Sequence, residues 1–537
     1  MSNKDKDTPG LADSEQARVQ SSAAKVSLAV FGSRILGLIR EVVFMGIFGP
    51  GFIMDAYYAA YRIPNLLRDL LAEGALSTAF VTTFSKKLKA EGQTAAFQLA
   101  NLVLTALAII MAWITLIGII GAPGLMVLNM GFYEVEGKIP LTIELTRILF
   151  PFIGVVSLAA IFMGLLNSLG SFGIPACAGI AFNLVSITTG YALGYLLDPE
   201  LGSKAIYGFA VGTVLGGIAQ LILQLPKAWS LGYRPKFILK LNDPDLRKVL
   251  KLMLPAVIGG AAVQINVMVN GWFASFLEEG SVSWLYNAFR LMQLPIGMFG
   301  VAFATVTLPS ISKSAQEADR SDFYNKLNLG LGNTFFLALP ASVGLAVLAE
   351  PIIGLVYQRG EFTAYDSLQA GLVLQGYAAG LAAYAGIKVI GPAFYALDKP
   401  SIPVKVSLLG IGLNIIFNIL FVFVLEKGAF GLALSTSLVA LINLFQLILY
   451  MNRVLGGMAI TKFLKDVATI IFMASIMGVC IYYLNQLLFA SEAQFFYQLI
   501  KIFILIGCGA TIYFGLGYAL RIPYLEVVRN FMKRLGH

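Results

Sequence analysis

The sequence predicts an all-α integral membrane protein with fourteen transmembrane helices. Of its 537 residues, 58% are hydrophobic and 12% are charged, whereas soluble domains average about 25% charged residues. The mean hydropathy is +0.80. The apolar residues recur in stretches of about 20, the length that an α-helix needs to cross a bilayer. This combination is typical of a helical protein that crosses the membrane many times.

Short polar loops join the fourteen apolar segments, and only the loop at 226–248 is long. Residues 1–22 are polar and charged and lack the apolar core of a signal peptide, so we predict a disordered cytoplasmic tail there. The expected transmembrane helices cover about 24–48, 53–84, 97–121, 141–168, 175–197, 204–225, 249–277, 282–312, 326–349, 367–396, 403–425, 428–451, 465–488 and 495–520.

The loops alternate in charge along the chain. SKKLKAEG, SKSAQEADRSDFYNKL and the C-terminal RIPYLEVVRNFMKRLGH each contain at least three lysine or arginine residues, whereas GPGFI, FLEEGSVS and LFASEAQ contain none. Basic loops stay on the cytoplasmic side of a membrane, so both termini are expected in the cytoplasm. The formal net charge of +9 is therefore mainly a topology signal, and nucleic-acid binding is not expected.

Two motifs recur at one offset. YAAYR at 58–62 matches YNAFR at 286–290, and LGSFGIP at 169–175 matches LDKPSIP at 397–403; both pairs are 228 residues apart. Helices 1–6 and 7–12 are thus predicted to be two copies of one bundle. Because six is even, both copies have the same orientation, which makes a parallel repeat.

The repeat divides the chain into a tail, two lobes of six helices and a final helix pair. Two like bundles are typical of transporters, whose substrates bind near the membrane midplane where the repeats meet. The predicted domains are the cytoplasmic tail 1–22, the N-lobe 23–231, the cytoplasmic linker 232–248, the C-lobe 249–453, and 454–537 with helices 13 and 14 and a cytoplasmic tail.

Several enzyme classes lack the residues that they need. The single histidine, His537, is the last residue, and the three cysteines lie in apolar runs without a CxxC motif. These residues make no metal site or disulfide framework. No GxxxxGK(S/T) phosphate-binding loop occurs, so ATP hydrolysis is not the expected source of energy. The sequence favours a transporter without covalent chemistry and without a metal.

Charged residues interrupt the apolar helices in an unusual way. GSRILGLIRE at 32–41 places Arg34, Arg40 and Glu41 inside the first predicted helix. An arginine at the centre of a bilayer costs about 2.5–3.5 kcal/mol on insertion scales. Such side chains must face a hydrated cavity or pair with acids. The alternative is that they are structural ion pairs or extend towards the membrane surface.

The arginines outnumber the acids on the same helices. Arginine's planar group suits two-point contact with phosphate. A cationic cavity in the membrane therefore predicts an anionic substrate, a phosphate or diphosphate. The substrate-binding candidates are Arg34, Arg40, Arg62, Arg68 and Arg290, and the supporting acidic or gating candidates are Glu41, Asp55, Asp69 and Glu73.

Four blocks resemble a known family. GSRILGLIRE, DAYYAAYRIPNLLRDLLAEGALSTAFV, SVSWLYNAFRLMQLPIGMFGVA and YQRGEFTAYDS are similar to the MurJ (MviN) lipid II flippases of the multidrug/oligosaccharidyl-lipid/polysaccharide (MOP) exporter superfamily. The resemblance runs along the chain from about residue 24. It implies a bacterial inner-membrane protein with two six-helix lobes and a final helix pair. It also implies movement of lipid II to the outer leaflet by alternating access.

The resemblance also implies roles for single residues. Arg34, Arg40, Arg68 and Arg290 match the cations that line the central cavity and bind the diphosphate of lipid II. Glu41 matches an acid beside the arginine of helix 1, and Asp55 matches the acid that opens helix 2. The last two helices would form a groove for the lipid tail. Proteins of cell-wall synthesis are the expected partners besides lipid II.

Two features depart from relatives. Phe289 and Gln293 stand where relatives often carry acids beside the arginine of helix 8. Some relatives also couple transport to Na⁺ through polar and acidic residues on helices 7, 11 and 12. The candidates here are all neutral: Asn266, Asn270, Asn414 and Asn418. Either they form a weak cation site or they make ordinary hydrogen bonds between helices.

No cofactor is expected, and a Na⁺ or H⁺ gradient or the membrane potential would reset the carrier. Three alternatives remain. The protein could export another polyprenyl-diphosphate-linked oligosaccharide, which the same arginines would suit. It could be a MOP-type drug/cation antiporter, although that function calls for an acidic cavity. An intramembrane enzyme acting on the same lipid would need a nucleophile and base that the sequence does not offer.

Overall fold

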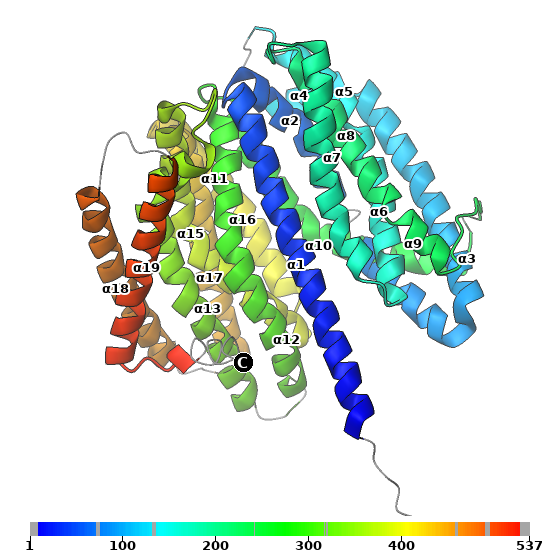
Figure 1. Cartoon of the computed structure of the whole chain (residues 1–537). Coiled ribbons are helices and arrows are strands. Elements are labelled where there is room, and N and C mark those ends of the chain that lie inside the picture. Colours follow the sequence, from blue (N-terminus) through cyan, green and yellow to red (C-terminus); the bar gives the residue numbers. More distant parts are fainter. Residues whose placement is uncertain are drawn as a thin grey trace, which may run out of the picture. The chain divides into compact units, whose positions relative to one another are not determined.

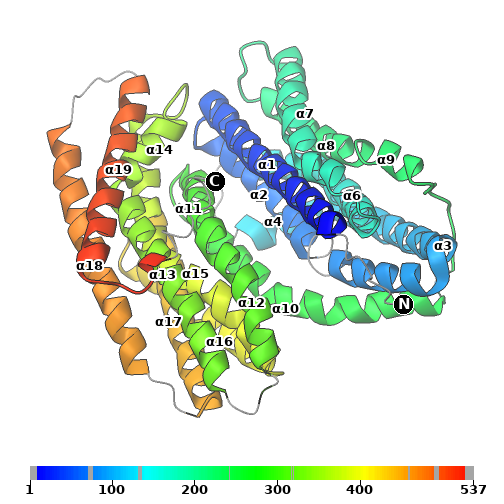
Figure 2. The ribbon, with the colours of Figure 1, turned by 60° about the horizontal axis from the view of Figure 1, so that its bottom comes forward.

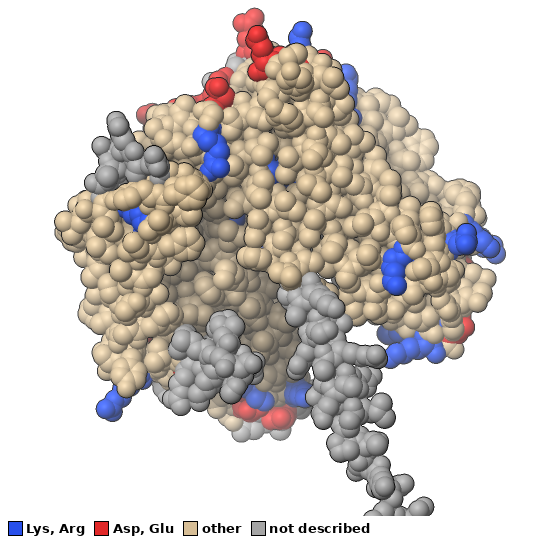
Figure 3. Space-filling model, viewed as in Figure 1, with Lys and Arg blue, Asp and Glu red and all other residues tan. Residues whose placement is uncertain are grey.

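The computed structural model describes residues 9–70, 76–130, 136–240, 242–315, 317, 320–456, 460–488 and 495–526. Within these residues the regular structure is helical, and no strand occurs. Eleven segments of this part of the chain are long and apolar enough to cross a membrane. Most of the face drawn in Figure 3 carries no charged side chain, and many of the charged side chains lie near its upper and lower edges. The prediction of an all-α membrane protein is confirmed.

Three of the fourteen expected spans are not among these eleven. They are 24–48, 53–84 and 249–277, and they fall on α1 (Pro9–Phe48), α2 (Phe52–Leu67) and α10 (Pro244–Ala274). α1 is helical but rich in charge, and residues 71–75 after α2 lie outside the described part. The count of fourteen stays a prediction.

The first helix is longer than the sequence suggests. α1 begins at Pro9, so it includes residues 9–22, where composition alone predicts a disordered tail. Alanine, glutamine, glutamate and arginine in this stretch all have good helix propensity, and proline is tolerated in the first turn of a helix. The polar stretch at 9–22 therefore extends the predicted membrane helix at its N-terminal end.

The chain forms two compact units. Unit 1 comprises Met1–Phe48, Ala56–Asn129 and Glu134–Gln264, and unit 2 comprises Gly49–Asp55, Met130–Tyr133 and Ile265–His537. Besides α1, α2 from Ala56 onward and the first part of α10, unit 1 contains α3 (Ser77–Ile120), α4 (Ala122–Met130), α5 (Lys138–Leu149), α6 (Pro151–Ser168), α7 (Gly173–Leu197), α8 (Ala205–Ile222) and α9 (Leu225–Ser230).

Glycines set the closest helix packing in unit 1. α7 and α8 lie side by side in Figure 1 and Figure 2. A Cβ atom added at Gly208 of α8 would lie 2.2 Å from the backbone nitrogen of Gly194 on α7, and one at Gly212 would lie 2.5 Å from the Cα of Gly190. Small residues four apart let helix backbones approach closely in membranes. The spacing of these glycines therefore allows the backbones of α7 and α8 to approach closely.

Unit 2 contains most of the C-terminal half of the chain. Its apolar core includes Phe336, Tyr513 and Tyr524, and the hydroxyl of Tyr513 donates to the carbonyl oxygen of Phe336 at 2.7 Å. Its helices after α10 are α11 (Ser281–Pro295), η2 (Ile296–Val301), α12 (Ala302–Ser314), α13 (Ser321–Val347), α14 (Ala349–Tyr357), α15 (Ala364–Ala396), α16 (Ser401–Ile419), η3 (Leu420–Val424), α17 (Gly428–Val454), α18 (Ile460–Leu487) and α19 (Phe495–Ala519).

The last two helices pack within unit 2. Figure 1 and Figure 2 both show α18 and α19 side by side, and α18 also packs against α13. Tyr513 of α19 contacts Phe336 of α13, with ring centroids 5.3 Å apart. The final helix pair, which lies outside the sequence repeat, is thus attached to the rest of unit 2 through α13.

Candidate functional site

The charges of α1 lie in two different environments. Arg34 is exposed, whereas Arg40 is only 6% exposed and Glu41 only 2%. The Nη2 atom of Arg40 lies 2.8 Å from Oε1 of Glu41. Glu41 is therefore the direct ion-pair partner of Arg40.

Two aromatic residues complete this buried pair within unit 1. The hydroxyl of Tyr58 on α2 donates to Oε2 of Glu41 at 2.7 Å. The guanidinium carbon of Arg40 lies 5.0 Å from the centre of the Phe182 ring on α7, within the range of a cation–π contact. Sequence reasoning missed both residues as partners, although Tyr58 stands in the repeated YAAYR motif, one turn before Arg62.

The second cationic group lies on and after α2. Arg62 is half-buried. Nη2 and Nε of Arg68 donate to Oδ1 of Asp69 at 2.7 and 3.1 Å. Both side chains of that pair are partly exposed, at 22% and 34%. The expected partner Glu73 lies outside the described residues.

Asp55 belongs to unit 2 and caps α11. Its carboxylate accepts hydrogen bonds from the backbone N–H of Gly280 at 2.9 Å, and from the backbone N–H and hydroxyl of Ser283 at 3.0 and 2.7 Å. Asp55 is 1% exposed. The first N–H groups of a helix have no partner inside it, and a carboxylate satisfies them well. The acid that opens α2 thus holds the start of α11.

Arg290 lies on α11, half-buried, and next to Phe289. The Phe289 ring packs against Tyr377 of α15, with ring centroids 5.4 Å apart. Phe289 thus makes an aromatic contact at the position where the family resemblance leads us to expect an acid. Since Arg290 belongs to unit 2 and the other four candidate arginines to unit 1, the convergence of all five on one substrate stays a prediction.

The neutral residues considered for a cation form a cluster in unit 2. Nδ2 of Asn418 donates to Oδ1 of Asn270 at 2.9 Å and to Oδ1 of Asn414 at 3.1 Å. Nδ2 of Asn270 donates to Oγ1 of Thr436 at 2.9 Å, and Nδ2 of Asn414 to Oγ of Ser435 at 3.3 Å. We call these five residues the asparagine cluster; they join α10, α16 and α17.

Asn266 is not joined to this cluster by a hydrogen bond. It lies one turn before Asn270 on α10, and its buried Oδ1 has no partner among the described residues. The same part of the chain contains no group of three or more histidine, cysteine, aspartate or glutamate residues that could hold a metal ion. Of the four asparagines singled out by sequence, the structure therefore brings three together.

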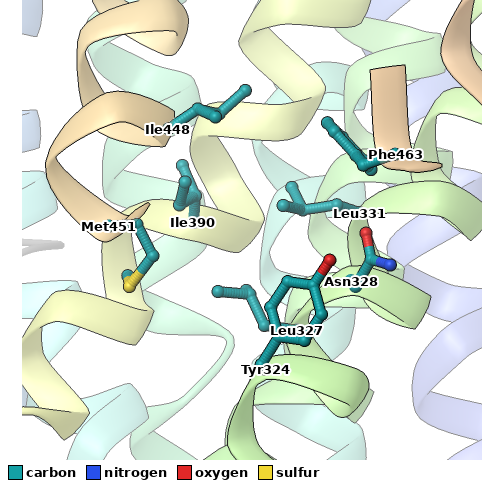
Figure 4. Close-up of a pocket in the computed structure, with 8 residues that line it drawn as sticks. All are labelled: Tyr324, Leu327, Asn328, Leu331, Ile390, Ile448, Met451 and Phe463. Atoms are coloured by element: carbon teal, nitrogen blue, oxygen red, sulfur yellow. The ribbon is translucent and has the colours of Figure 1, made fainter. Parts of the chain in front are cut away.

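Unit 2 also contains a small apolar pocket between α13, α15, α17 and α18 (Figure 4). Tyr324, Leu327, Ile390 and Phe463 are among the residues that line it. Its volume of about 20 Å³ is close to what one water molecule requires. It is too small for a lipid or sugar, so the candidate site rests on the charged residues described above.

Comparison with known proteins places the chain among flippases. The family described as "Lipid II flippase MurJ" matches residues 44–503. The chain is 35% identical to the probable lipid II flippase MurJ of Vibrio cholerae, covering 80% of this chain and 82% of that protein. It is 34% identical to the lipid II flippase MurJ of Burkholderia cenocepacia, covering 78% and 81%.

Solved structures agree with this comparison. A lipid II flippase MurJ in an inward closed conformation superposes with a TM-score of 0.75 at 29% identity, covering 92% of this chain and 99% of that one. An inward-facing multidrug resistance MATE transporter of the MOP superfamily gives 0.62 at 15% identity, covering 80% and 94%. The second likeness concerns the fold alone.

Proposed function

Because this chain belongs to the lipid II flippase MurJ family, we propose that it translocates lipid II, the undecaprenyl-diphosphate disaccharide pentapeptide, from the cytoplasmic to the outer leaflet of the bacterial inner membrane. The family match over residues 44–503 carries this proposal. The eleven apolar spans of the described residues support a multi-pass membrane protein. Both termini are proposed to be cytoplasmic, from the charge of the loops.

The full architecture belongs to the same proposal. It has fourteen helices, with the lobes at 23–231 and 249–453, the linker at 232–248, and the last two helices and a cytoplasmic tail at 454–537. Movement by alternating access requires bodies that keep their internal packing. Separate hydrophobic cores support this, one around Phe80 and Phe150 in unit 1 and one around Phe336 and Tyr513 in unit 2.

The diphosphate is proposed to bind arginine side chains. Arg40 illustrates the chemistry: its guanidinium is buried and held by the carboxylate of Glu41. When the diphosphate binds, its oxygens take over or share this guanidinium. When it leaves, Glu41 again balances the charge, which avoids the cost of an unpaired buried cation. The other binding residues are Arg34, Arg62, Arg68 and Arg290, with Asp55, Asp69 and Glu73 as supporting acids.

No covalent bond is made or broken in this function, and no cofactor takes part. Moving one elementary charge across 100 mV is worth about 2.3 kcal/mol. A membrane that is negative inside therefore favours outward movement of an anionic head group. The membrane potential or a Na⁺ or H⁺ gradient would reset the carrier. Lipid II is the proposed partner, and proteins of cell-wall synthesis are further candidates.

The direct test measures lipid II on the outer face of the membrane. Bacteria depleted of their own flippase express the wild type, Arg40→Ala or Arg290→Ala, and an enzyme added outside cleaves only exposed lipid II. We expect cleavage with the wild type and its loss with both variants at equal membrane levels. Arg147→Ala is the matched control, because Arg147 is an exposed arginine in the last turn of α5 outside the proposed site.

A wild-type protein that is present in the membrane but restores no cleavage would contradict the lipid II assignment. Purified protein incubated with lipid II should yield no new covalent product. A cleaved or transferred product would instead identify an enzyme.

A further inference from the structure

We propose that the asparagine cluster of unit 2 is held together by hydrogen bonds between neutral side chains, and that the amide nitrogen of Asn418 occupies the place of a bound cation. We call this arrangement the clasp. The family resemblance implies that some relatives bind Na⁺ at these helices, and the side chains of this chain do not fit that ion. The transport consequence, that flipping does not depend on a Na⁺ gradient through this cluster, rests on the proposed function. The chemistry of the cluster itself does not.

The amide nitrogen of Asn418 lies between two side-chain oxygens that could otherwise bind a cation. The two side-chain oxygens that converge there belong to Asn270 and Asn414, on two different helices. Nδ2 of Asn418 lies 2.9 and 3.1 Å from them. An amide nitrogen carries two hydrogens, and both are used in these two bonds. A group with partial positive charge thus already lies between the oxygens that a cation would have to bind.

The outer members of the cluster are also satisfied. Thr436 accepts from Asn270 and donates to the carbonyl oxygen of Leu432 at 2.9 Å. Ser435 accepts from Asn414 and donates to its backbone carbonyl at 3.4 Å. Asn414 and Asn418 are both 0% exposed. The hydrogen bonds thus connect three helices through neutral side chains, of which only Asn270 is half-buried rather than buried.

The neutral charge of the cluster also disfavours a bound cation. All five side chains are neutral amides or hydroxyls. A cation moved from water into a protein interior loses several kcal/mol of hydration that a paired anion must offset. A carboxylate ligand would provide that anion, and none of the five residues carries one. In the observed orientation the oxygens of Asn270 and Asn414 that converge on one point are already occupied, and the cluster carries no negative charge that would favour Na⁺.

If the side-chain amide of Asn418 were turned so that Oδ1 and Nδ2 exchanged places, the cluster would have an arrangement that competes with the clasp. Oδ1 of Asn418 is buried without a partner among the described residues, which is the cost of the clasp. If the amide were turned, both bonds to Asn270 and Asn414 would be lost and three oxygens would converge. Only a cation between them would stabilise that arrangement. The clasp and the cation-bound arrangement are thus alternative states of one cluster, and added Na⁺ would stabilise only the second.

The experiment is thermal unfolding of the purified full-length protein in NaCl, KCl and choline chloride at equal ionic strength and mildly alkaline pH. The wild type is expected to unfold at the same temperature in all three salts. Asn418→Asp removes both donated hydrogen bonds and supplies a carboxylate. We expect this variant to unfold at a lower temperature in KCl and choline chloride, and to regain several degrees selectively in NaCl, since a ligand that binds only the folded state stabilises it.

Asn443→Asp is the matched control. Asn443 lies on α17, half-buried, and its Oδ1 also has no partner among the described residues, but it is not part of the cluster. Its variant should be destabilised without a selective response to Na⁺. A saturable, Na⁺-specific rise in the unfolding temperature of the wild type would overturn the clasp. An Asn418→Asp protein that unfolds like the wild type in every salt would also overturn it.

The transport consequence has its own readout. Wild-type cells should expose lipid II equally when external Na⁺ is replaced by choline. Failure of the wild type to expose lipid II in any medium would contradict the proposed function and leave the unfolding result unaffected. Lipid II exposure could instead require Na⁺ while the unfolding temperature of the purified protein does not respond to Na⁺. That result would place the coupling of transport to Na⁺ in another part of the protein.

Discussion

The carboxylate of Asp55 accepts two hydrogen bonds from Ser283, one from its backbone N–H at 3.0 Å and one from its hydroxyl at 2.7 Å. The two residues are 228 positions apart, which is the offset of the internal repeat in the sequence. In the predicted repeat they would therefore occupy equivalent positions in the two copies. One copy carries the acid that opens a helix, and the other carries the helix start that this acid caps.

Replacing Asp55 with alanine should destabilise unit 2. The change leaves the N–H groups of Gly280 and Ser283 without their acceptor at a buried helix start. We expect a loss of about 2 kcal/mol, at the upper end of the range for helix caps. Ser283→Ala keeps both backbone bonds and should lose only about 1 kcal/mol. Thermal unfolding of the two variants checks the order, and an Asp55→Ala protein as stable as the wild type would show that the cap is not needed.

Arg40 and Glu41 should differ in what they do for stability and for transport. Arg40→Ala leaves the Glu41 carboxylate buried, and removing one partner of a buried pair costs about 3–5 kcal/mol. The double variant Arg40→Met/Glu41→Gln removes both charges, while the glutamine carbonyl can still accept from Tyr58. We expect it to restore the unfolding temperature but not the exposure of lipid II on intact cells.

Arg34 provides the comparison for that experiment. It is exposed and forms no ion pair with the described residues. Arg34→Ala should therefore leave the unfolding temperature unchanged and still reduce lipid II exposure. Recovery of transport by the Arg40→Met/Glu41→Gln protein would mean that the buried pair serves folding only.

The contact between α7 and α8 should tolerate no added methyl group. In Gly212→Ala the new Cβ would lie 2.5 Å from the Cα and the backbone nitrogen of Gly190. Such overpacking costs about 1–3 kcal/mol. Gly173→Ala, at the start of α7, meets nothing within 4 Å and should be neutral. Equal unfolding temperatures for the two variants would contradict the close helix approach.

Tyr233 should make unit 1 less stable at alkaline pH. Its hydroxyl is buried and donates to Oδ1 of Asn101 at 2.8 Å, and burial raises the pKa of this phenol. In the unfolded chain a tyrosine loses its proton at about pH 10, while the folded protein keeps it. The unfolded state then binds fewer protons, so stability falls as pH rises above about 10.

The comparison with Tyr233→Phe isolates this effect. The variant loses the hydrogen bond to Asn101 and should be less stable by about 1 kcal/mol at neutral pH. Because phenylalanine does not titrate, the difference from the wild type should shrink as pH rises above about 10. Unfolding temperatures of both proteins, measured along a pH series, test this expectation. A difference between them that stays constant would contradict a buried, protonated Tyr233 phenol.

Much of the fold follows from local properties of the chain. Apolar stretches of membrane-spanning length predict the helices because each helix satisfies its own backbone hydrogen bonds. The stretch at 9–22 shows the limit of that reasoning, because composition predicts disorder there and the structure continues α1 through it. Local polarity does not decide whether a helix ends when the helix that follows is stable.

The sequence by itself determined the all-helical membrane class and the family, and it supplied the charged residues that we propose for transport. Only the tertiary structure decided how those charges are arranged. It pairs Arg40 with Glu41, Tyr58 and Phe182, and it makes Asp55 a cap for α11. The physical reason is that hydropathy is a sum over neighbouring residues, whereas a hydrogen bond depends on atoms from distant helices meeting within about 3 Å.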